Sequence, residues 1–265
     1  MSSYNHLEII REIKPLPHLC VFLNRPEVHN AFNEELISEL TACFTDANKA
    51  NDIRAVILGG HGRSFCAGAD LSWMRKSADF TYEENLEDAE ALANLFATID
   101  QSRKPVIGRI NGAAIGGGSG LVAACDIAVA VERAKFGFSE INLGIIPAVI
   151  SPYVLAKIGV ANARELFLTG ERFPAARARE IGLVQYVVAE EELDKRISEL
   201  LSALHSSGPQ AIAACKELIK TVAPAPKNQV QSYTVQLIAK LRTSEEGKEG
   251  IMSFLEKRKP EWLSD

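Results

Sequence analysis

The segment Asn111–Gly120, NGAAIGGGSG, follows the short apolar run Pro105–Ile110 and leads into another apolar stretch. A glycine-rich turn between a buried strand and a helix leaves backbone N–H groups free at the helix N-terminus, where the helix dipole also favours negative charge. Two phosphate-binding patterns do not fit, because the glycine spacing misses the dinucleotide fingerprint and no Gly-Lys-Ser/Thr follows. The turn therefore predicts either a backbone site for an oxyanion or the tight packing of a helix on a sheet.

Short apolar runs alternate with amphipathic segments on both sides of this turn. Leu19–Leu23 and Ala55–Leu58 are short, apolar and partly β-branched, as expected of buried strands. Between them, Leu36, Leu40 and Phe44 recur on one face of a predicted helix. Strands that alternate with helices predict an α/β fold with largely parallel strand pairing.

After about residue 190 the pattern changes to helices alone. Four helical segments are expected, at 191–205, 209–222, 229–242 and 244–258. We therefore divide the chain into an α/β core over 1–190 and a helical region over 191–265. The apolar stripes of this region need a surface to cover them, and either the core or a neighbouring subunit can provide it.

The composition narrows the class of protein. The 265 residues include 29 Lys+Arg and 34 Asp+Glu, a net charge of −5, with 47% hydrophobic and 24% charged residues. These values are those of an average globular protein, and the acidic balance disfavours nucleic-acid binding. No apolar run approaches the ~20 residues that a membrane helix needs. The five widely spaced cysteines and the absence of a visible targeting segment predict a reducing compartment, with the cytoplasm as the default.

A second glycine-containing loop, Phe65–Asp70 or FCAGAD, precedes another probable helix. Its small residues Ala67, Gly68 and Ala69 let a ligand approach the backbone closely, so main-chain N–H groups there can act as donors. The ordinary alternative is a strand-to-helix turn that Asp70 caps.

A third segment, Phe136–Pro147, contains Glu140 in an apolar, glycine-punctuated stretch without a nearby basic residue. Desolvation would raise the pKa of a carboxyl group in such surroundings, which suits a general acid and base. A solvated or helix-capping glutamate is the alternative reading of this segment alone.

Taken in this order, the segments make the chain resemble the enoyl-CoA hydratase/isomerase (crotonase) superfamily over essentially its whole length. The resemblance rests on LNRP at 23–26, NAFN at 30–33, FCAGAD at 65–70, NGAAIGGGSG at 111–120, CD at 125–126, FGFSE at 136–140, GIIP at 144–147 and FLEKRKPEW at 254–262. Within the superfamily, GGGSGLVAACDIAVA with IIPAVISPYV looks most like the bacterial methylglutaconyl-CoA hydratases.

The resemblance implies a fold, a substrate class and a set of site residues. The fold would be a spiral of repeated β-β-α units with a C-terminal helical trimerisation region, and trimers of such proteins often pair into hexamers. The substrate would be a coenzyme A thioester, with no separate cofactor and no metal. The backbone N–H groups of Ala67 and Gly117 would bind the thioester oxygen, and Glu140 would be the catalytic acid and base. The residues expected to contact substrate or coenzyme A are Arg25, His29, Ala31, Ala67, Gly68, Ala69, Asp70, Leu71, Gly116, Gly117, Gly120 and Pro147.

One position departs from the family pattern. Hydratases of this family usually hold a second glutamate four residues after the first glycine of the GGG run, and here that position is Gly120. We hypothesise that Gly120 makes room for a branched or carboxylated acyl group. The reaction would then be the reversible hydration of 3-methylglutaconyl-CoA to 3-hydroxy-3-methylglutaryl-CoA in leucine degradation.

Two other functions stay open at this point. A double-bond isomerase that converts a 3-enoyl-CoA to a 2-enoyl-CoA needs only one carboxylate, which Glu140 can supply. A non-enzymatic RNA-binding relative is the alternative from another class, although only Lys257–Lys259 forms a basic cluster. A metal at His29 or His61 is disfavoured, because no second ligand lies at a suitable spacing.

Overall fold

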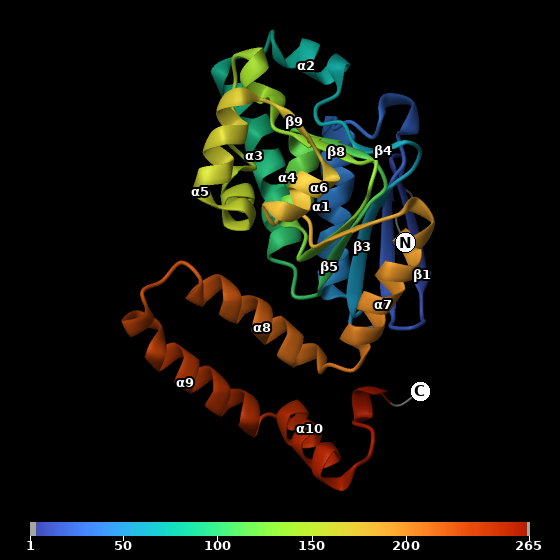
Figure 1. Cartoon of the computed structure of the whole chain (residues 1–265), viewed down its shortest axis with the longest axis vertical. Coiled ribbons are helices and arrows are strands. Elements are labelled where there is room, and N and C mark those ends of the chain that lie inside the picture. Colours follow the sequence, from blue (N-terminus) through green and yellow to red (C-terminus); the bar gives the residue numbers. More distant parts are fainter. Residues whose placement is uncertain (1–3, 264–265) are drawn as a thin grey trace.

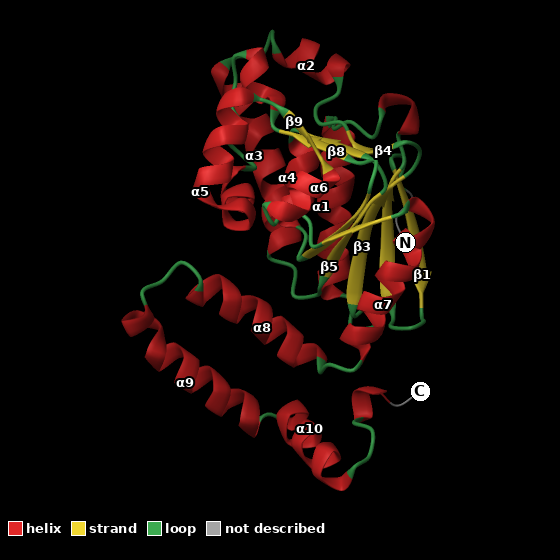
Figure 2. Cartoon of the chain, viewed as in Figure 1, coloured by secondary structure: helices red, strands yellow, loops and turns green. Residues whose placement is uncertain are grey.

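The computed structural model describes residues 4–263, which form an α/β core and a separate helical arm (Figures 1 and 2). The strands of the large sheet, in spatial order, are β1 (Leu7–Glu12), β2 (His18–Leu23), β3 (Ala55–Gly60), β5 (Val106–Ile110), β7 (Ile127–Val131) and β10 (Tyr186–Val188). Only β1 is antiparallel to its neighbour in this sheet. The strands of the small sheet are β4 (Ser64–Cys66), β6 (Ala113–Ile115), β8 (Lys135–Gly137) and β9 (Arg172–Pro174).

The two sheets are built from one repeated unit. The pairs β3/β4, β5/β6 and β7/β8 each give one strand to the large sheet and the next strand to the small sheet, before helical structure follows. The helices after the three pairs are α2 (Leu71–Ser77) with α3 (Tyr82–Asp100), α4 (Gly117–Ala124) and α5 (Ser151–Thr169). The expected spiral of β-β-α units is therefore confirmed.

Burial explains why these segments adopt these structures. Every residue of β3 is buried, as expected for a strand of a parallel sheet that is covered on both faces. Helix α1 (Glu34–Lys49) packs Leu36, Leu40 and Phe44 into the core, which confirms the predicted helical face. The Asn33 side chain starts this helix by accepting a hydrogen bond of 2.9 Å from the Leu36 N–H.

Helix α6 (Ala175–Glu180) precedes β10, and from residue 190 to 263 the chain is helical, as predicted. The elements of this region are α7 (Leu193–His205), α8 (Pro209–Val222), α9 (Lys227–Thr243) and α10 (Glu245–Glu256), with single 3-10 turns at Glu190–Glu192 and Glu261–Leu263. Helix α7 buries Leu193, Ile197, Leu200 and Leu201 against the core, next to β5 and β7. Helices α8, α9 and α10 stand away from the core in Figure 1, and we call these three helices the arm.

Polar contacts attach this arm to the core of its own chain. The Lys216 ammonium group on α8 donates to the Asp126 carboxylate at 2.5 Å, and Lys220 pairs with Asp100 at 2.7 Å. Apart from Ser253, no residue of α8, α9 or α10 is buried. Ion pairs therefore help to hold the arm to the core, while large apolar side chains such as Ile219, Val235 and Phe254 remain exposed.

All five cysteines are free thiols, as the sequence predicts, and four of them are buried. Among the described residues, no helix has the length and apolar character needed to cross a membrane.

Candidate active site

Three predicted segments meet at one edge of the small sheet. Strands β4, β6 and β8 are parallel neighbours, so their carboxyl ends lie side by side. The loop 67–70 follows β4, the turn Gly116–Gly117 follows β6, and Glu140 follows β8 on the 3-10 helix Ser139–Leu143. The topology thus brings together residues that are more than seventy positions apart in the chain.

Glu140 lies directly against the glycine turn. A Cβ atom added at Gly116 would be 3.0 Å from the Glu140 Oε1 atom, and Gly116 has φ +55°, which glycine adopts without strain. The Glu140 Oε2 atom is buried and accepts no hydrogen bond from the described residues. Burial raises the pKa of this carboxyl group. The site therefore holds one carboxyl group that is poised to take and return a proton.

The glycines also bring two backbones into contact. A Cβ atom at Gly118 would lie 2.1 Å from the Cys66 carbonyl oxygen, so only glycine lets the start of α4 approach β4. At Gly68, with φ +90°, an added Cβ atom would be 2.8 Å from the Ile115 oxygen and 3.8 Å from the Gly117 nitrogen. The two alternatives that the sequence left open, tight packing and an oxyanion site, are therefore both compatible with this turn.

The structure corrects one of the two predicted donors. The Ala67 N–H donates to the His29 carbonyl at 3.0 Å, so it is not available to a thioester oxygen. Ala69 is exposed, and its N–H has no hydrogen-bond partner among residues 4–263. The Gly117 N–H is the first of α4, and it likewise has no hydrogen-bond partner among residues 4–263. Ala69 and Gly117, rather than Ala67 and Gly117, are therefore the free donors beside Glu140.

Sequence reasoning listed Ala69 as a contact residue but did not assign it as a donor, because the choice between the two alanines depends on distant backbone partners. The Phe32 N–H donates to the Gly68 carbonyl at 2.7 Å, and the Asp70 N–H donates to the Phe32 carbonyl at 2.9 Å. These two bonds make an isolated parallel bridge between Phe32 and Ala69, in which the N–H of the middle residue, Ala69, points away from Phe32. A glycine between two alanines was the only signal in the sequence, and it does not say which alanine is free.

Arg25 and Asp70, both predicted to contact substrate, bind each other. The Arg25 guanidinium donates to the Asp70 carboxylate at 3.0 Å and to the Ala31 carbonyl at 2.6 Å. Asp70 also caps α2 by accepting from the Ser72 N–H at 2.8 Å. Burial raises the pKa of Asp70, but the Ser72 N–H and the Arg25 charge outweigh this effect and hold it below its ordinary value. The Arg25–Asp70 ion pair therefore holds the loop that contains Ala69 in position.

His29 and Ala31 complete the same loop. His29 has a left-handed backbone, with φ +55°, and its ring contacts the Ser64 hydroxyl at 3.1 Å. Ala31 is buried. Neighbouring Asn30 is fully buried and donates to the carbonyls of His61 and Ser64, at 2.8 and 3.0 Å. This loop therefore depends on Asn30, which the sequence did not single out as a site residue.

Gly120 does not face free space, which contradicts the expectation that it makes room for a larger acyl group. A Cβ atom there would lie 2.3 Å from the Ile150 Cγ2 atom and 3.1 Å from the Phe96 Cε1 atom. Both of these side chains are buried. Neighbouring Ser119 is not a replacement acid, because its hydroxyl is fully buried and donates to the Ala114 carbonyl at 2.7 Å. The position of the second family acid is thus filled by apolar packing.

Apolar side chains form an exposed rim on the segments that surround Glu140. Leu71 is 82% exposed at the start of α2, and Leu143, Ile145 and Ile146 are 55–66% exposed just after Glu140. Pro147, another predicted contact residue, is buried in the same segment. Exposed leucines and isoleucines in one place are typical of a surface that another molecule covers.

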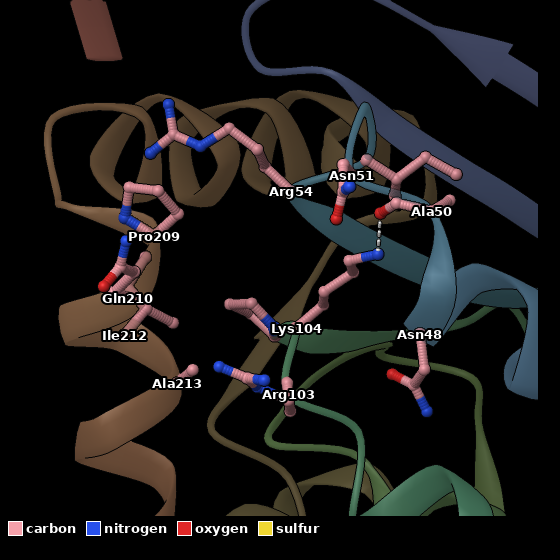
Figure 3. A pocket seen from close by; sticks show the side chains of 12 residues that line it. Asn48, Ala50, Asn51, Arg54, Arg103, Lys104, Pro209, Gln210, Ile212 and Ala213 are labelled. Carbon is pink, nitrogen blue, oxygen red and sulfur yellow. Dashed lines mark hydrogen bonds between the residues drawn. The ribbon is translucent and has the colours of Figure 1, made fainter. Parts of the chain in front are cut away.

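A separate cavity of about 270 Å³ lies between the core and the start of α8 (Figure 3). No carboxylate lines it. Its Lys104 ammonium group donates to the carbonyls of Ala47 and Ala50, and the Arg54 guanidinium donates to those of Ser207 and Trp262. Arg54 thus links the core to the two ends of the arm, whereas Lys104 binds carbonyls at the end of α1 within the core. The cavity is therefore a structural joint and not the active site.

Comparison with known proteins agrees with this geometry. The family model described as enoyl-CoA hydratase/isomerase matches residues 19–265. A putative enoyl-CoA hydratase of Thermus thermophilus is 32% identical over 242 residues, which cover 91% of this chain and 95% of that protein. A probable enoyl-CoA hydratase of Bacillus subtilis is 36% identical over 248 residues, 89% of this chain and 92% of that one.

Solved structures give the same result. A putative enoyl-CoA hydratase/isomerase (crotonase) from Legionella pneumophila is 42% identical, with a TM-score of 0.91 over 98% of this chain and 100% of that one. An enoyl-CoA hydratase from Shewanella pealeana is 39% identical, with a TM-score of 0.94 over 98% and 97%.

The fold and the buried, unpartnered Glu140 carboxyl group beside free backbone donors define an acyl-CoA enzyme of the crotonase type, as the sequence predicted. The chain belongs to the enoyl-CoA hydratase/isomerase family and is an enoyl-CoA hydratase-type enzyme.

Proposed function

We propose that this enzyme hydrates a 2-enoyl-CoA with Glu140 as its one proton carrier and with the Ala69 and Gly117 N–H groups on the thioester oxygen. The observation that carries the proposal is the buried, unpartnered Oε2 atom of Glu140 beside the turn that begins α4. The helix dipole at this turn favours the negative charge that develops on the thioester oxygen.

The reaction follows from these positions. Glu140 takes a proton from water, whose oxygen forms a bond to C3 of the acyl group. The electron pair of the 2,3-double bond moves toward the thioester, and the enolate oxygen is stabilised by the two N–H groups. Glu140 then returns the proton to C2, which restores the thioester and leaves a hydroxyl group on C3. Because position 120 holds no acid, the same carboxyl group performs both transfers.

The specific substrate that we propose is 3-methylglutaconyl-CoA, which the enzyme would convert to 3-hydroxy-3-methylglutaryl-CoA in leucine degradation. Support comes from the sequence similarity around 116–130 and 145–154. Since Ile150 fills the space next to Gly120, the branch and the distal carboxylate must lie elsewhere in the site.

Substrate profiling of the wild type beside Glu140→Gln tests mechanism and substrate together. The amide keeps the size of the side chain but cannot take a proton from water, so we expect kcat to fall by roughly 10²–10⁴-fold with every substrate. Near-normal activity of this variant contradicts the mechanism. A clear preference of the wild type for crotonyl-CoA over 3-methylglutaconyl-CoA contradicts only the branched substrate.

A second candidate function, isomerisation of a 3-enoyl-CoA to a 2-enoyl-CoA, is favoured by the single acid. One carboxyl group that removes a proton from C2 and returns it to C4 is enough for that reaction. Incubation in H₂¹⁸O separates the two functions, because a hydratase places the label in its product and an isomerase does not.

We also propose that the arm, α8 to α10, mediates self-association into a trimer or a hexamer. Ile219, Val235, Phe254 and Leu255 are 59–82% exposed, although the arm is already fastened to its own core by ion pairs. Light scattering on the wild type and Phe254→Asp tests this proposal. We expect an oligomer for the wild type and a smaller species for the variant, and a monomeric wild type refutes it.

A further inference from the structure

A cluster of three potential metal ligands lies at the turn end of the β1–β2 hairpin, where the two strands are connected. In the antiparallel register of the two strands, Glu12 pairs directly with His18. Cys20 is two residues further along β2, so it lies on the same face of the strand as His18. The ligand atoms of these three residues are all within 4.8 Å of one another. The spacing along the chain does not reveal this cluster, because Glu12 is brought next to His18 and Cys20 only by the pairing of the two strands.

The His18 ring is already oriented for a ligand. His18 is 3% exposed, and its Nδ1 atom lies 2.6 Å from the Leu16 carbonyl oxygen, an acceptor that requires the proton to be on Nδ1. The Nε2 atom therefore presents its lone pair to the cluster. Its distance to the Glu12 carboxylate, 3.7 Å, is too long for a hydrogen bond. A hydrogen bond from the other ring nitrogen to a carbonyl oxygen is what normally fixes a metal-binding histidine.

We propose that Glu12, His18 and Cys20 form a binding site for Zn²⁺, with water as the fourth ligand. Bond lengths of ~2.0–2.3 Å place neighbouring ligand atoms of a tetrahedral zinc ion roughly 3.3–3.7 Å apart. The 3.7 Å between His18 Nε2 and the Glu12 carboxylate lies at the upper end of this range, and the Cys20 sulfur, within 4.8 Å of both ligand atoms, completes the set after side-chain movement. Imidazole, thiolate and carboxylate together suit zinc better than Ca²⁺ or Mg²⁺, which prefer oxygen ligands alone.

The surrounding charges favour a cation. Besides Glu12, the charged groups that act on the Cys20 thiol are Arg109 and Asp194. The Arg109 guanidinium donates twice to the Asp194 carboxylate, at 2.6 and 3.0 Å, so these two charges largely cancel. The negative charge of the Glu12 carboxylate is therefore not compensated by these two groups. A zinc ion with one thiolate and one carboxylate is electrically neutral, which suits a site with two buried ligands.

Metal binding must displace a proton from the thiol. Burial raises the pKa of Cys20 to about 12, so the free protein holds this side chain as S–H at neutral pH. When the sulfur binds zinc, the S–H bond breaks and its proton passes to the buffer. We therefore expect close to one proton to be released for each ion bound.

The site is separate from the active site. His18 lies at the start of β2, whereas the loop with Arg25 and His29 follows the other end of this strand. A metal here would hold β1 to β2 and would not touch the substrate. The competing explanation is a cross-strand pair of His18 and Glu12 beside a core cysteine, which predicts no specific metal binding at all.

The experiment is titration of chelator-treated protein with ZnCl₂ by calorimetry in two buffers that differ in ionisation enthalpy, followed by dialysis and metal analysis. CoCl₂ provides a spectroscopic probe, because a cobalt–thiolate bond gives a charge-transfer band. We expect one ion per chain, one proton released, a thiolate band, and a rise in melting temperature on the order of 5 °C at saturating zinc.

Two ligand variants and two controls make the result specific. Glu12→Gln alters an exposed side chain and is expected to weaken zinc binding at least tenfold without a change in the stability of the metal-free protein. Cys20→Ser is expected to remove the cobalt band. The controls are Glu8→Gln, on the same strand, and Cys215→Ser, the exposed cysteine; both should bind like the wild type.

Three results would overturn the site. They are no binding of zinc to the wild type at micromolar concentrations, unchanged binding in both Glu12→Gln and Cys20→Ser, and loss of binding in Cys215→Ser.

Discussion

Replacing Gly116 by alanine adds one methyl group at the point where the glycine turn meets Glu140. The new Cβ atom would lie 3.0 Å from Oε1 and 3.5 Å from Cδ of this side chain, on a residue with φ +55°. Two effects follow. The backbone conformation costs about 1–3 kcal/mol of stability in a residue other than glycine. The carboxyl group must also move by several tenths of an ångström to restore normal contact.

The second effect falls on catalysis. A misplacement of ~1 Å in an active site costs about 10²-fold in rate, so a shift of several tenths of an ångström is expected to lower kcat by roughly 10-fold or more. The KM should change less, because the backbone donors at Ala69 and Gly117 remain. Steady-state kinetics with the preferred enoyl-CoA, measured below the melting temperature of each variant, gives the two parameters separately.

Gly159→Ala is the matched control. Gly159 also has positive φ, +71°, but an added Cβ atom there meets nothing within 4 Å. It should show a comparable loss of stability, measured by urea denaturation, and normal turnover. The reasoning is refuted if Gly116→Ala keeps kcat within twofold of the wild type, or if Gly159→Ala loses as much.

Combining Gly116→Ala with Glu140→Asp sharpens the test. Aspartate withdraws the carboxyl group by one carbon–carbon bond, about 1.5 Å, away from the added methyl group. If steric contact is the cause, the loss caused by Gly116→Ala should be much smaller in the aspartate background than in the wild type, a coupling that a double-mutant cycle measures. Losses that simply add would show that the two residues act independently.

Three further predictions concern stability and are checked by urea denaturation. Burial raises the pKa of Glu140 in the folded protein, so the native state favours its neutral form. Glu140→Gln should therefore be more stable than the wild type at pH 8, and this advantage should shrink as the pH falls through the raised pKa. A pH-independent difference in stability contradicts this prediction. Arg25→Met leaves the nearly buried Asp70 carboxylate unpaired and should lower the free energy of unfolding by about 3 kcal/mol. Arg11→Met breaks an exposed pair with Asp52 and should lower it by less than ~1 kcal/mol. Equal losses would refute this assignment. Gly118→Ala puts a methyl group 2.1 Å from the Cys66 oxygen and should prevent normal folding, so a native-like melting temperature would show that the helix can move.

The sequence was sufficient for features that depend on local patterns. The apolar runs at Leu19–Leu23 and Ala55–Leu58 became β2 and β3, and the stripe that includes Leu36 became the buried face of α1. In each case the information lies within a few residues of the feature itself.

The sequence was insufficient where partners are distant. Which alanine of the 67–69 loop is free depends on hydrogen bonds to His29 and Phe32, which lie more than thirty residues away. The filling of the space at Gly120 depends on Ile150, thirty residues later, and on Phe96. Both errors have the same cause, because a glycine in a sequence shows where a side chain is absent but not what occupies the space.

The contact between Gly120 and Ile150 has a consequence for how this enzyme can change. An acid introduced at position 120 first would collide with the Ile150 side chain at 2.3 Å. Shortening Ile150 first would open a cavity in the core, at a cost of about 2–5 kcal/mol for a change to alanine. In either order, the protein with the first substitution alone is impaired. Introducing the second acid therefore requires positions 120 and 150 to change together. Packing, rather than the demands of the reaction, thus keeps the one-acid arrangement in place.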